Sequence, residues 1–271
     1  YIMKRNLLVL SMFVSAFVLN VTPALAWGKR EHAAIARIAE QNLSAKARKG
    51  IAEILGDQKP SSYASWLDYY KTQMMMKLTE PQNGKMERTI PHTFQVDSAL
   101  NAYRNPERSC ITVIEESVAK LKNRASLDDS TRFQCLLNII HLVGDMHCPG
   151  HVIYADKRDR HIGKFDVYFR GEKTNFHRVW DSMVTGDTFA GGVEDLAYFA
   201  MTADKKQIRE WQSGSLYDWG SDVAHTSSYI WDVKIGDDLG TRYMYDHSRL
   251  ALTMICRAGY RLAKVLNETF K

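Results

Sequence analysis

The sequence lacks several features that would place it in large classes of proteins. Its 271 residues contain no internal repeat, no low-complexity segment and no linker long enough to separate two domains, which indicates a single domain. Its formal net charge of +5 is too weak a bias to predict nucleic-acid binding from charge alone.

Apolar runs of membrane-spanning length are also missing. The apolar run Leu7–Leu19 is too short for a span and is interrupted by two serines. It follows a basic pair and precedes Ala-Leu-Ala at 24–26, which is typical of a signal-peptide cleavage site. We therefore predict a signal peptide at 1–26, a mature domain at 27–271 and a periplasmic or secreted location, with a retained N-terminal anchor as the alternative. Cleavage would leave 34 basic against 31 acidic residues, a net charge of +3.

Cysteine is sparse, with four residues in the chain. Export leads to an oxidising compartment, where a disulfide can form. Cys110 and Cys256 are each expected to open a helical segment and are the predicted pair. Cys135 and Cys148 lie on or near one predicted helix, on different faces and too far apart along its axis to bond.

Helical periodicity, by contrast, runs through nearly the whole mature chain. The predicted helices cover residues 32–43, 45–55, 62–76, 106–121, 129–147 and 249–266. Residues 79–91 carry loop signals, Phe94 and Val96 indicate a short extended piece, and the alternation over 165–170 predicts a small β-ribbon. The predicted fold class is therefore all-α, a single-domain multi-helix bundle with a small β-ribbon.

Histidine and aspartate are concentrated in two short segments. In HLVGDMHCPGH, His141 and Asp145 are four residues apart and share one helix face. The proline two residues before His151 should end that helix, so that His151 can fold back from the following loop. His177 and Asp181, in NFHRVWD, repeat the four-residue spacing. Because imidazole and carboxylate groups bind zinc well, two such pairs and a further histidine predict a metal centre.

Further candidate ligands come from other predicted helices or their edges, namely His32, Asp68 and His92. Ligands spread over several helices of one bundle are how a buried site for several metals is built. Structural zinc sites are usually closed four-ligand shells rich in cysteine, whereas these candidates are histidine and aspartate. The donor set therefore favours a catalytic site over a purely structural one.

The chain resembles the S1/P1 nuclease family, exported zinc-dependent enzymes that share a helical fold with bacterial phospholipase C. The resemblance covers almost the whole mature chain and rests on WGKREH (27–32), SWLD (65–68), PHTF (91–94), HLVGDMHCPGH (141–151), NFHRVWD (175–181) and AGYRLAKVLN (258–267). It implies the phospholipase C/P1 nuclease fold and the hydrolysis of phosphodiester bonds by a site with three zinc ions.

The resemblance also implies a set of protein ligands for each zinc ion. The first set is Asp68, His92, His141 and Asp145. The second set is His32, the shared Asp145, and Trp27 through its α-amine and carbonyl. The third set is His151, His177 and Asp181. Asp68 and Asp145 are the predicted catalytic residues. A zinc-binding N-terminal tryptophan supports cleavage between Ala26 and Trp27, because an amine within a peptide bond cannot bind metal.

The sequence departs from the family pattern beside these ligands. The run usually written HQPLH is HCPGH, so Cys148 and Gly150 replace glutamine and leucine. Gly163 stands where the family has an asparagine that helps to hold the base. Gln95 replaces an aspartate or asparagine and is the predicted substrate-binding residue. We interpret Cys148 as a small packing change, with a redox-sensitive neighbour of the metals as the alternative.

Two more histidines lie near these segments. His147 is six residues past His141, so we expect it to face away from the ligand side of its helix and to serve as a supporting or capping group. His161 is expected in a loop, either solvated or close to the third zinc.

The predicted function is an exported, monomeric zinc phosphodiesterase that cuts single-stranded DNA and RNA and removes 3′-phosphates from nucleotides. No stable membrane association is expected after signal cleavage. The altered base-reading residues leave two alternatives. One is a phospholipase C-like hydrolase that uses the same metals, and the other is a zinc-binding homologue without turnover.

Overall fold

The computed structural model of this protein describes residues 27–71, 90–155, 165–186 and 188–271. The predicted signal peptide, all but the last two residues of the predicted 79–91 loop, Gly163 and His161 lie outside the described residues. Among the described residues, no helix combines the length and the apolar character that crossing a bilayer requires.

Helices make up most of the described chain. The N-terminal group is α1 (Lys29–Gln41), α2 (Ala45–Leu55), α3 (Pro60–Tyr63) and α4 (Trp66–Lys71). The central group is α6 (Cys110–Lys122), η1 (Arg124–Ser126), α7 (Asp129–Met146) and η2 (Pro149–His151). The last group is α8 (Phe176–Arg178), η4 (Val179–Met183), α9 (Val184–Gly186), α10 (Val193–Ala200), α11 (Lys205–Trp211), α12 (Leu216–Ser227), η5 (Ser228–Trp231) and α13 (Thr241–Thr269).

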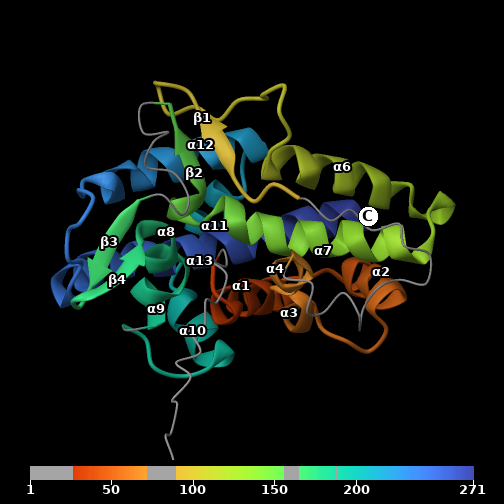
Figure 1. Cartoon of the computed structure of the whole chain (residues 1–271). Helices are drawn as coiled ribbons and strands as arrows, with labels where there is room; N and C mark the ends of the chain where they lie inside the picture. The colour runs from red at the N-terminus through yellow and green to blue at the C-terminus, as the bar shows by residue number, and fades with distance from the viewer. Residues whose placement is uncertain (1–26, 72–89, 156–164, 187) are drawn as a thin grey trace, which may run out of the picture.

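Helix α7 lies at the centre of the bundle. Helices α6, α13, α2, α4 and α1 all pack against it, and α1 also crosses the long C-terminal α13 (Figure 1). Its residues from Gln134 to Met146 are all buried. A helix that is covered on every side needs apolar or fully satisfied residues all round. The polar residues in its last turns therefore require partners inside the protein.

The predicted helices are largely confirmed, and local signals explain their starts. The Ser44 side chain accepts the backbone N–H of Ala47 and caps α2, and Asp128 caps α7 in the same way. The helix predicted over 62–76 is wrong as one element, because a turn separates α3 from α4. The helix predicted over 106–121 starts only at Cys110, where Ser109 forms its cap. The last helix begins at Thr241, eight residues before the predicted start.

Two small sheets complete the fold. Strands β1 (Phe94–Val96) and β2 (Val152–Tyr154) pair in parallel, with Phe94 opposite Val152. Strands β3 (Asp166–Phe169) and β4 (Glu172–Asn175) form the predicted antiparallel ribbon. In a parallel pair, the residues that precede both strands lie at the same end of the sheet. The first sheet therefore brings the segment before β1 next to the end of η2, and the candidate ligands His92 and His151 lie in these two segments.

The predicted Cys110–Cys256 disulfide is wrong in this structure, where all four cysteines are free and buried. Cys110 opens α6 as expected, but Cys256 lies in the middle of α13 rather than at a helix start. The sulfur of Cys256 faces the backbone of Thr202 and Ala203 instead. The prediction failed because sequence spacing says nothing about which faces of two distant helices meet.

Gly259 marks the closest approach of α13 to α1. A Cβ at this position would lie 2.5 Å from Cβ and Cγ2 of Ile38 and 3.2 Å from the carbonyl oxygen of Ile35. We expect Gly259→Ala to lower the free energy of unfolding by about 1–3 kcal/mol, the usual cost of overpacking a core, as measured by urea denaturation. The control is Gly186→Ala, where an added Cβ meets no atom within 4 Å. Equal stability of the two variants would contradict this prediction.

Candidate metal centre

The predicted side-chain ligands lie on several helices and on the segment before β1, and they meet near the end of α7. His32 comes from α1, Asp68 from α4, and His141 and Asp145 from the last turns of α7. His92 precedes β1, His151 closes η2, and His177 and Asp181 lie on the helical run from α8 into η4. All eight side chains are buried, with relative exposures between 0% and 8%. The tertiary structure therefore brings together residues that span 150 positions of the sequence.

Asp145 lies at the centre of this group. Its Oδ1 is 3.3 Å from Nε2 of His32, while its Oδ2 is 2.7 Å from Nδ1 of His92 and 3.1 Å from Nε2 of His141. The two oxygens thus face different histidines. This is the arrangement that a carboxylate shared between two cations requires. The rings of His32 and His141 stack with centroids 4.0 Å apart, so the two sets are contiguous.

Gly144 makes the approach of α1 to α7 possible. A Cβ at this position would lie 2.8 Å from Nδ1 of His32, a separation that side chains do not adopt. His32 therefore reaches Asp145 over a helix position that must lack a side chain.

Asp68 completes a compact set with His92 and His141. Its Oδ1 lies 3.5 Å from Nε2 of His141 and 3.8 Å from Nδ1 of His92. Ligands at about 2.1 Å from a tetrahedral zinc are separated from one another by about 3.4 Å. The distances within this set scatter around that separation. Three of its atoms, one each from Asp68, His92 and His141, form a group that can hold a metal ion.

A second cluster lies on the other side of Asp145. Nε2 of His177 is 3.3 Å from Oδ2 of Asp181, and Nε2 of His151 is 3.8 Å from its Oδ1. The His151 and His177 rings stack with centroids 4.7 Å apart. Asp181 lies in η4, a π-helical segment, and such segments occur frequently at functional sites. Nδ1 of His151 is 3.6 Å from Oδ1 of Asp145, which connects the two clusters.

Backbone carbonyls fix the orientation of two of the histidines. Nδ1 of His141 donates to the carbonyl of Ala64 at 2.7 Å, and Nδ1 of His151 donates to the carbonyl of His92 at 3.0 Å. Each bond directs Nε2 of the same ring into the cluster. Histidines that bind metals are usually held in this way.

Many of the buried polar atoms of these clusters lack hydrogen-bond partners, although Nε2 of His141 and Nδ1 of His92 share a hydrogen bond of 3.2 Å. The unsatisfied atoms include Oδ2 of Asp68, both carboxylate oxygens of Asp145, Oδ2 of Asp181, and Nε2 of His32, His92 and His151. A buried donor or acceptor without a partner costs about 1–3 kcal/mol, and a charged group costs more. Several of these atoms lie within 4 Å of one another without forming hydrogen bonds, as the ligands of a shared cation would. The donor set therefore fits divalent metal ions.

Electrostatics within the clusters depend on the same burial. Burial disfavours a charged His141 ring, but the carboxylates of Asp145 and Asp68 outweigh it and raise the pKa of His141 to about 10. Burial raises the pKa of Asp181 well above its usual value, and repulsion from Asp145 and Asp68 adds to this. Burial also lowers the pKa of His177 to about 4. A bound cation would lower the pKa of the carboxyl groups, because it favours their ionised form.

The segment that begins at Trp27 lies against the second cluster. Trp27 is fully buried, and the N–H of Gly28 donates to the backbone carbonyl of Asp181. Glu31 is a buried residue that the sequence prediction missed. Its Oε1 accepts hydrogen bonds from Thr185 and Arg30, and its Oε2 would lie 2.6 Å from a Cβ on Gly28. A charged residue in the first turn of a helix is typical of a solvated face, so no sequence signal identified it.

His147 and Gln95 lie outside these clusters. As predicted, His147 faces away from the ligands: its Nδ1 donates to the carbonyl of Val143, and its Nε2 accepts from Arg261, which pairs with Asp222. Gln95 lies on β1, where its side-chain oxygen accepts hydrogen bonds from Tyr103 at 3.1 Å and from Asn105 at 2.7 Å. The amide of Gln95 is thus held in one orientation.

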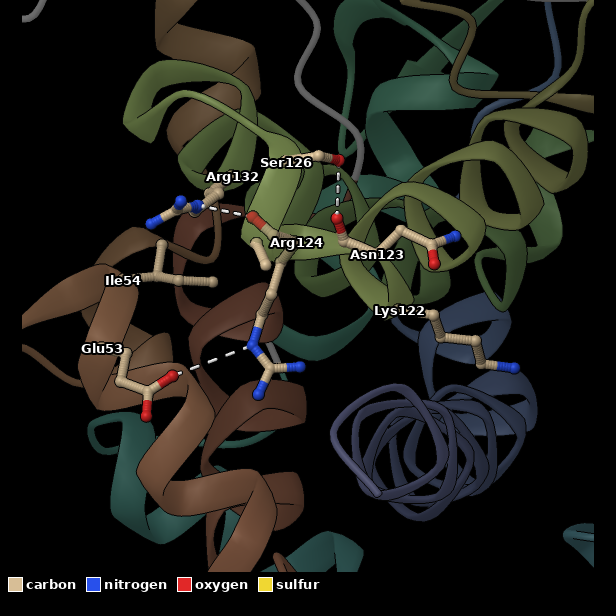
Figure 2. A pocket seen from close by; sticks show the side chains of 8 residues that line it. Glu53, Ile54, Lys122, Asn123, Arg124, Ser126 and Arg132 are labelled. Carbon is tan, nitrogen blue, oxygen red and sulfur yellow. Dashed lines mark hydrogen bonds and ion pairs between the residues drawn. The ribbon is translucent and has the colours of Figure 1, made fainter.

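A cavity of about 670 Å³ (Figure 2) lies beside the start of α7, whereas the candidate metal ligands of α7 lie in its last turns. Lys122, Arg124 and Arg132 line it together with the acidic Glu53, which approaches Arg124 at 3.8 Å. Its lining contains no histidine and one carboxylate, so it does not offer a metal site. Variants in this cavity are suitable controls for changes in the clusters.

The chain is similar in sequence to a known protein family. The model of the S1/P1 Nuclease family matches residues 27–271. The chain is 23% identical to Endonuclease 2 of Arabidopsis thaliana, in an alignment that covers 98% of this chain and 99% of the relative. It is 25% identical to Nuclease S1 of Aspergillus oryzae, over 89% of this chain and 91% of the relative. It is 26% identical to Nuclease P1 of Penicillium citrinum, over 86% and 83% respectively.

An all-α bundle with groups of buried histidine and aspartate atoms, matched to this family, defines a hydrolase that acts on phosphodiester bonds. The chain belongs to the S1/P1 nuclease family, and it is a nuclease with nucleic acid as its substrate. The predicted family and the all-α class are confirmed.

Proposed function

We propose that this protein is an exported, monomeric endonuclease and 3′-nucleotidase that binds three zinc ions and cuts single-stranded DNA and RNA. The observation that carries the proposal is the contiguous set of buried, unsatisfied histidine and aspartate atoms around Asp145. Signal-peptide removal after Ala26 is part of the proposal, since it gives Trp27 a free amine. The single-strand preference follows because a pocket for an unstacked base cannot reach one inside a duplex.

The proposed ligands follow the clusters of the structure. Asp68, His92, His141 and Asp145 would hold the first zinc. His32, Asp145 and Trp27 would hold the second. His151, His177 and Asp181 would hold the third. Bound zinc ions would supply a hydrolytic water that is deprotonated near neutral pH and would neutralise charge on the phosphoryl oxygens.

The chain's own residues organise this chemistry. Asp145, one of the two proposed catalytic aspartates with Asp68, separates its two oxygens between different histidines and so fixes the spacing of the sets. The carbonyls of Ala64 and His92 lock the rings of His141 and His151 before any ligand binds. We assign substrate binding to Gln95, because Tyr103 and Asn105 hold its amide ready for a contact with a base.

The test compares two substrates with the mature chain, which starts at Trp27. We expect cleavage of single-stranded DNA, a loss of more than about a hundredfold on chelation, and recovery with zinc. Phosphatidylcholine vesicles should remain intact. The control is Arg124→Gln in the remote cavity, which should behave as the unmodified protein does.

Two results would overturn the proposal. Hydrolysis of phosphatidylcholine with single-stranded DNA left intact would identify a phospholipase C-like enzyme. Absence of turnover on either substrate, with three zinc ions bound per chain, would identify a binding protein that has lost catalysis.

A further inference from the structure

The Cys148 thiol lies inside the cluster of His151, His177 and Asp181. Cys148 directly precedes η2 and is fully buried. Its Sγ is 4.0 Å from Oδ1 of Asp181. Cys148, His151 and Asp181 each present one atom, all within 4.8 Å of one another, as a group that can hold a metal ion. The thiol donates a hydrogen bond to Oδ1 of Asp181, the same oxygen that lies 3.8 Å from Nε2 of His151.

Unsatisfied atoms of the neighbouring residues provide an independent indication of a bound cation. Nε2 of His151 and Oδ2 of Asp181 are buried without hydrogen-bond partners, and both residues are at most 2% exposed. For a tetrahedral zinc with a Zn–S distance of about 2.3 Å and Zn–O of about 2.1 Å, sulfur and oxygen are about 3.6 Å apart. The observed 4.0 Å between Sγ and Oδ1 lies a few tenths of an ångström from that value.

The other cysteines have ordinary surroundings. The sulfur of Cys135 faces the Ser117 hydroxyl, and that of Cys256 faces the backbone of Thr202 and Ala203. Among the described residues, Cys148 is the cysteine that falls in a group able to hold a metal. A buried thiol usually fills space as a small apolar group. Cys148 differs from Cys135 and Cys256, because its sulfur lies beside a carboxylate oxygen and an imidazole nitrogen that are both candidate metal ligands.

Gly150 keeps the space beside the sulfur open. A Cβ at this position would lie 3.8 Å from Sγ of Cys148, 3.6 Å from Nδ1 of His177 and 3.3 Å from Cβ of Trp180. A longer side chain built on that Cβ would press on the sulfur and on the imidazole together. The two departures from the family pattern, Cys148 and Gly150, therefore act at one place.

We propose that Cys148 is a fourth protein ligand, as a thiolate, of the zinc ion held by His151, His177 and Asp181. This inference rests on the proposed function, which supplies that zinc. On coordination the Cys148 S–H proton is released to solvent and the Zn–S bond forms, with no change in oxidation state. Four protein ligands close the shell of a tetrahedral zinc, as in structural sites. The catalytic work then falls to the two zinc ions around Asp145.

Cobalt substitution tests the sulfur directly, because Co²⁺ bound to a thiolate shows a near-ultraviolet sulfur-to-metal charge-transfer absorption. The mature protein is loaded with three Co²⁺ ions, and its spectrum is compared with those of Cys148→Ser and the matched control Cys135→Ser. We expect the absorption in the unmodified protein and in the control, and its loss in Cys148→Ser. Competition with a chelator should show that Cys148→Ser weakens zinc binding at this site about tenfold or more.

A second variant controls for the possible misfolding of Cys148→Ser. With Cys110, Cys135 and Cys256 all changed to alanine, Cys148 is the sole cysteine and the charge-transfer absorption should persist. Three bound Co²⁺ ions without this absorption in the unmodified protein would overturn the inference and leave the proposed function intact. A protein that binds no Co²⁺ at the His151, His177 and Asp181 site would overturn the proposed function itself.

Discussion

Asp145→Asn is expected to lower the rate of single-stranded DNA cleavage by more than about a thousandfold, a loss typical of removing a central electrostatic element from an active site. The two oxygens of Asp145 face His32 on one side and His92 and His141 on the other. An amide removes the charge and replaces one acceptor with a donor, so both sets of ligands lose their common member. Initial rates and the zinc content of the purified protein measure the effect.

The expected zinc content of Asp145→Asn distinguishes the loss of a shared ligand from a general loss of metal. His151, His177 and Asp181 do not depend on Asp145 as a ligand, so we expect the zinc content to fall from three ions towards one. Asp129→Asn is the matched control, since it makes the same change on the same helix at a side chain that is 98% exposed. Full activity with three zinc ions in Asp145→Asn would contradict the bridging role.

A single residue left before Trp27 is expected to produce the second largest loss. Trp27 is fully buried, and the following residue is tied to the carbonyl of Asp181. A chain that starts at Ala26 would place an amide where the proposed function requires a free amine. Loss of a metal ligand should weaken zinc binding at the His32 and Asp145 site at least about tenfold. Zinc titration against a competing chelator and the cleavage rate at limiting zinc measure this effect.

The control for this chain is the same protein after the extra alanine has been removed with an aminopeptidase. Zinc affinity and activity should then return to those of the chain that starts at Trp27. Equal zinc affinity in the extended and trimmed proteins would show that the terminal amine is not a ligand. Because the extension alters no side chain of the bundle, a change in helix packing does not account for the expected loss.

Much of the helical framework follows from local signals in the sequence. Ser44 and Asp128 cap the helices that follow them, and the alternation over 165–170 forms a ribbon strand. These features depend on neighbours within a few residues, which is why a single sequence predicts them. The break between α3 and α4 and the early start of α13 were missed. At the break, the carbonyl of Ala64 accepts a hydrogen bond from His141, which lies far away in the sequence.

The metal centre was predictable in its members but not in its geometry. The His-x-x-x-Asp spacing places His141 with Asp145, and His177 with Asp181, on common helix faces, and the distances of 3.1 and 3.3 Å agree with this. The approach of His92 to His151 depends instead on the parallel pairing of β1 with β2. That pairing joins segments almost 60 residues apart, and no local pattern specifies it.

The sequence by itself determined the helical class, the caps, the family and the residue types that favour metals, because each is encoded in short-range spacing and chemistry. Only the tertiary structure decided which atoms meet. It left all four cysteines free, turned His147 towards Arg261, buried Glu31 beside Gly28 and placed the Cys148 sulfur against Asp181. These outcomes depend on how helix faces and strand ends pack against one another. Packing between elements far apart in the chain is a property of the whole fold and cannot be assigned to any single segment.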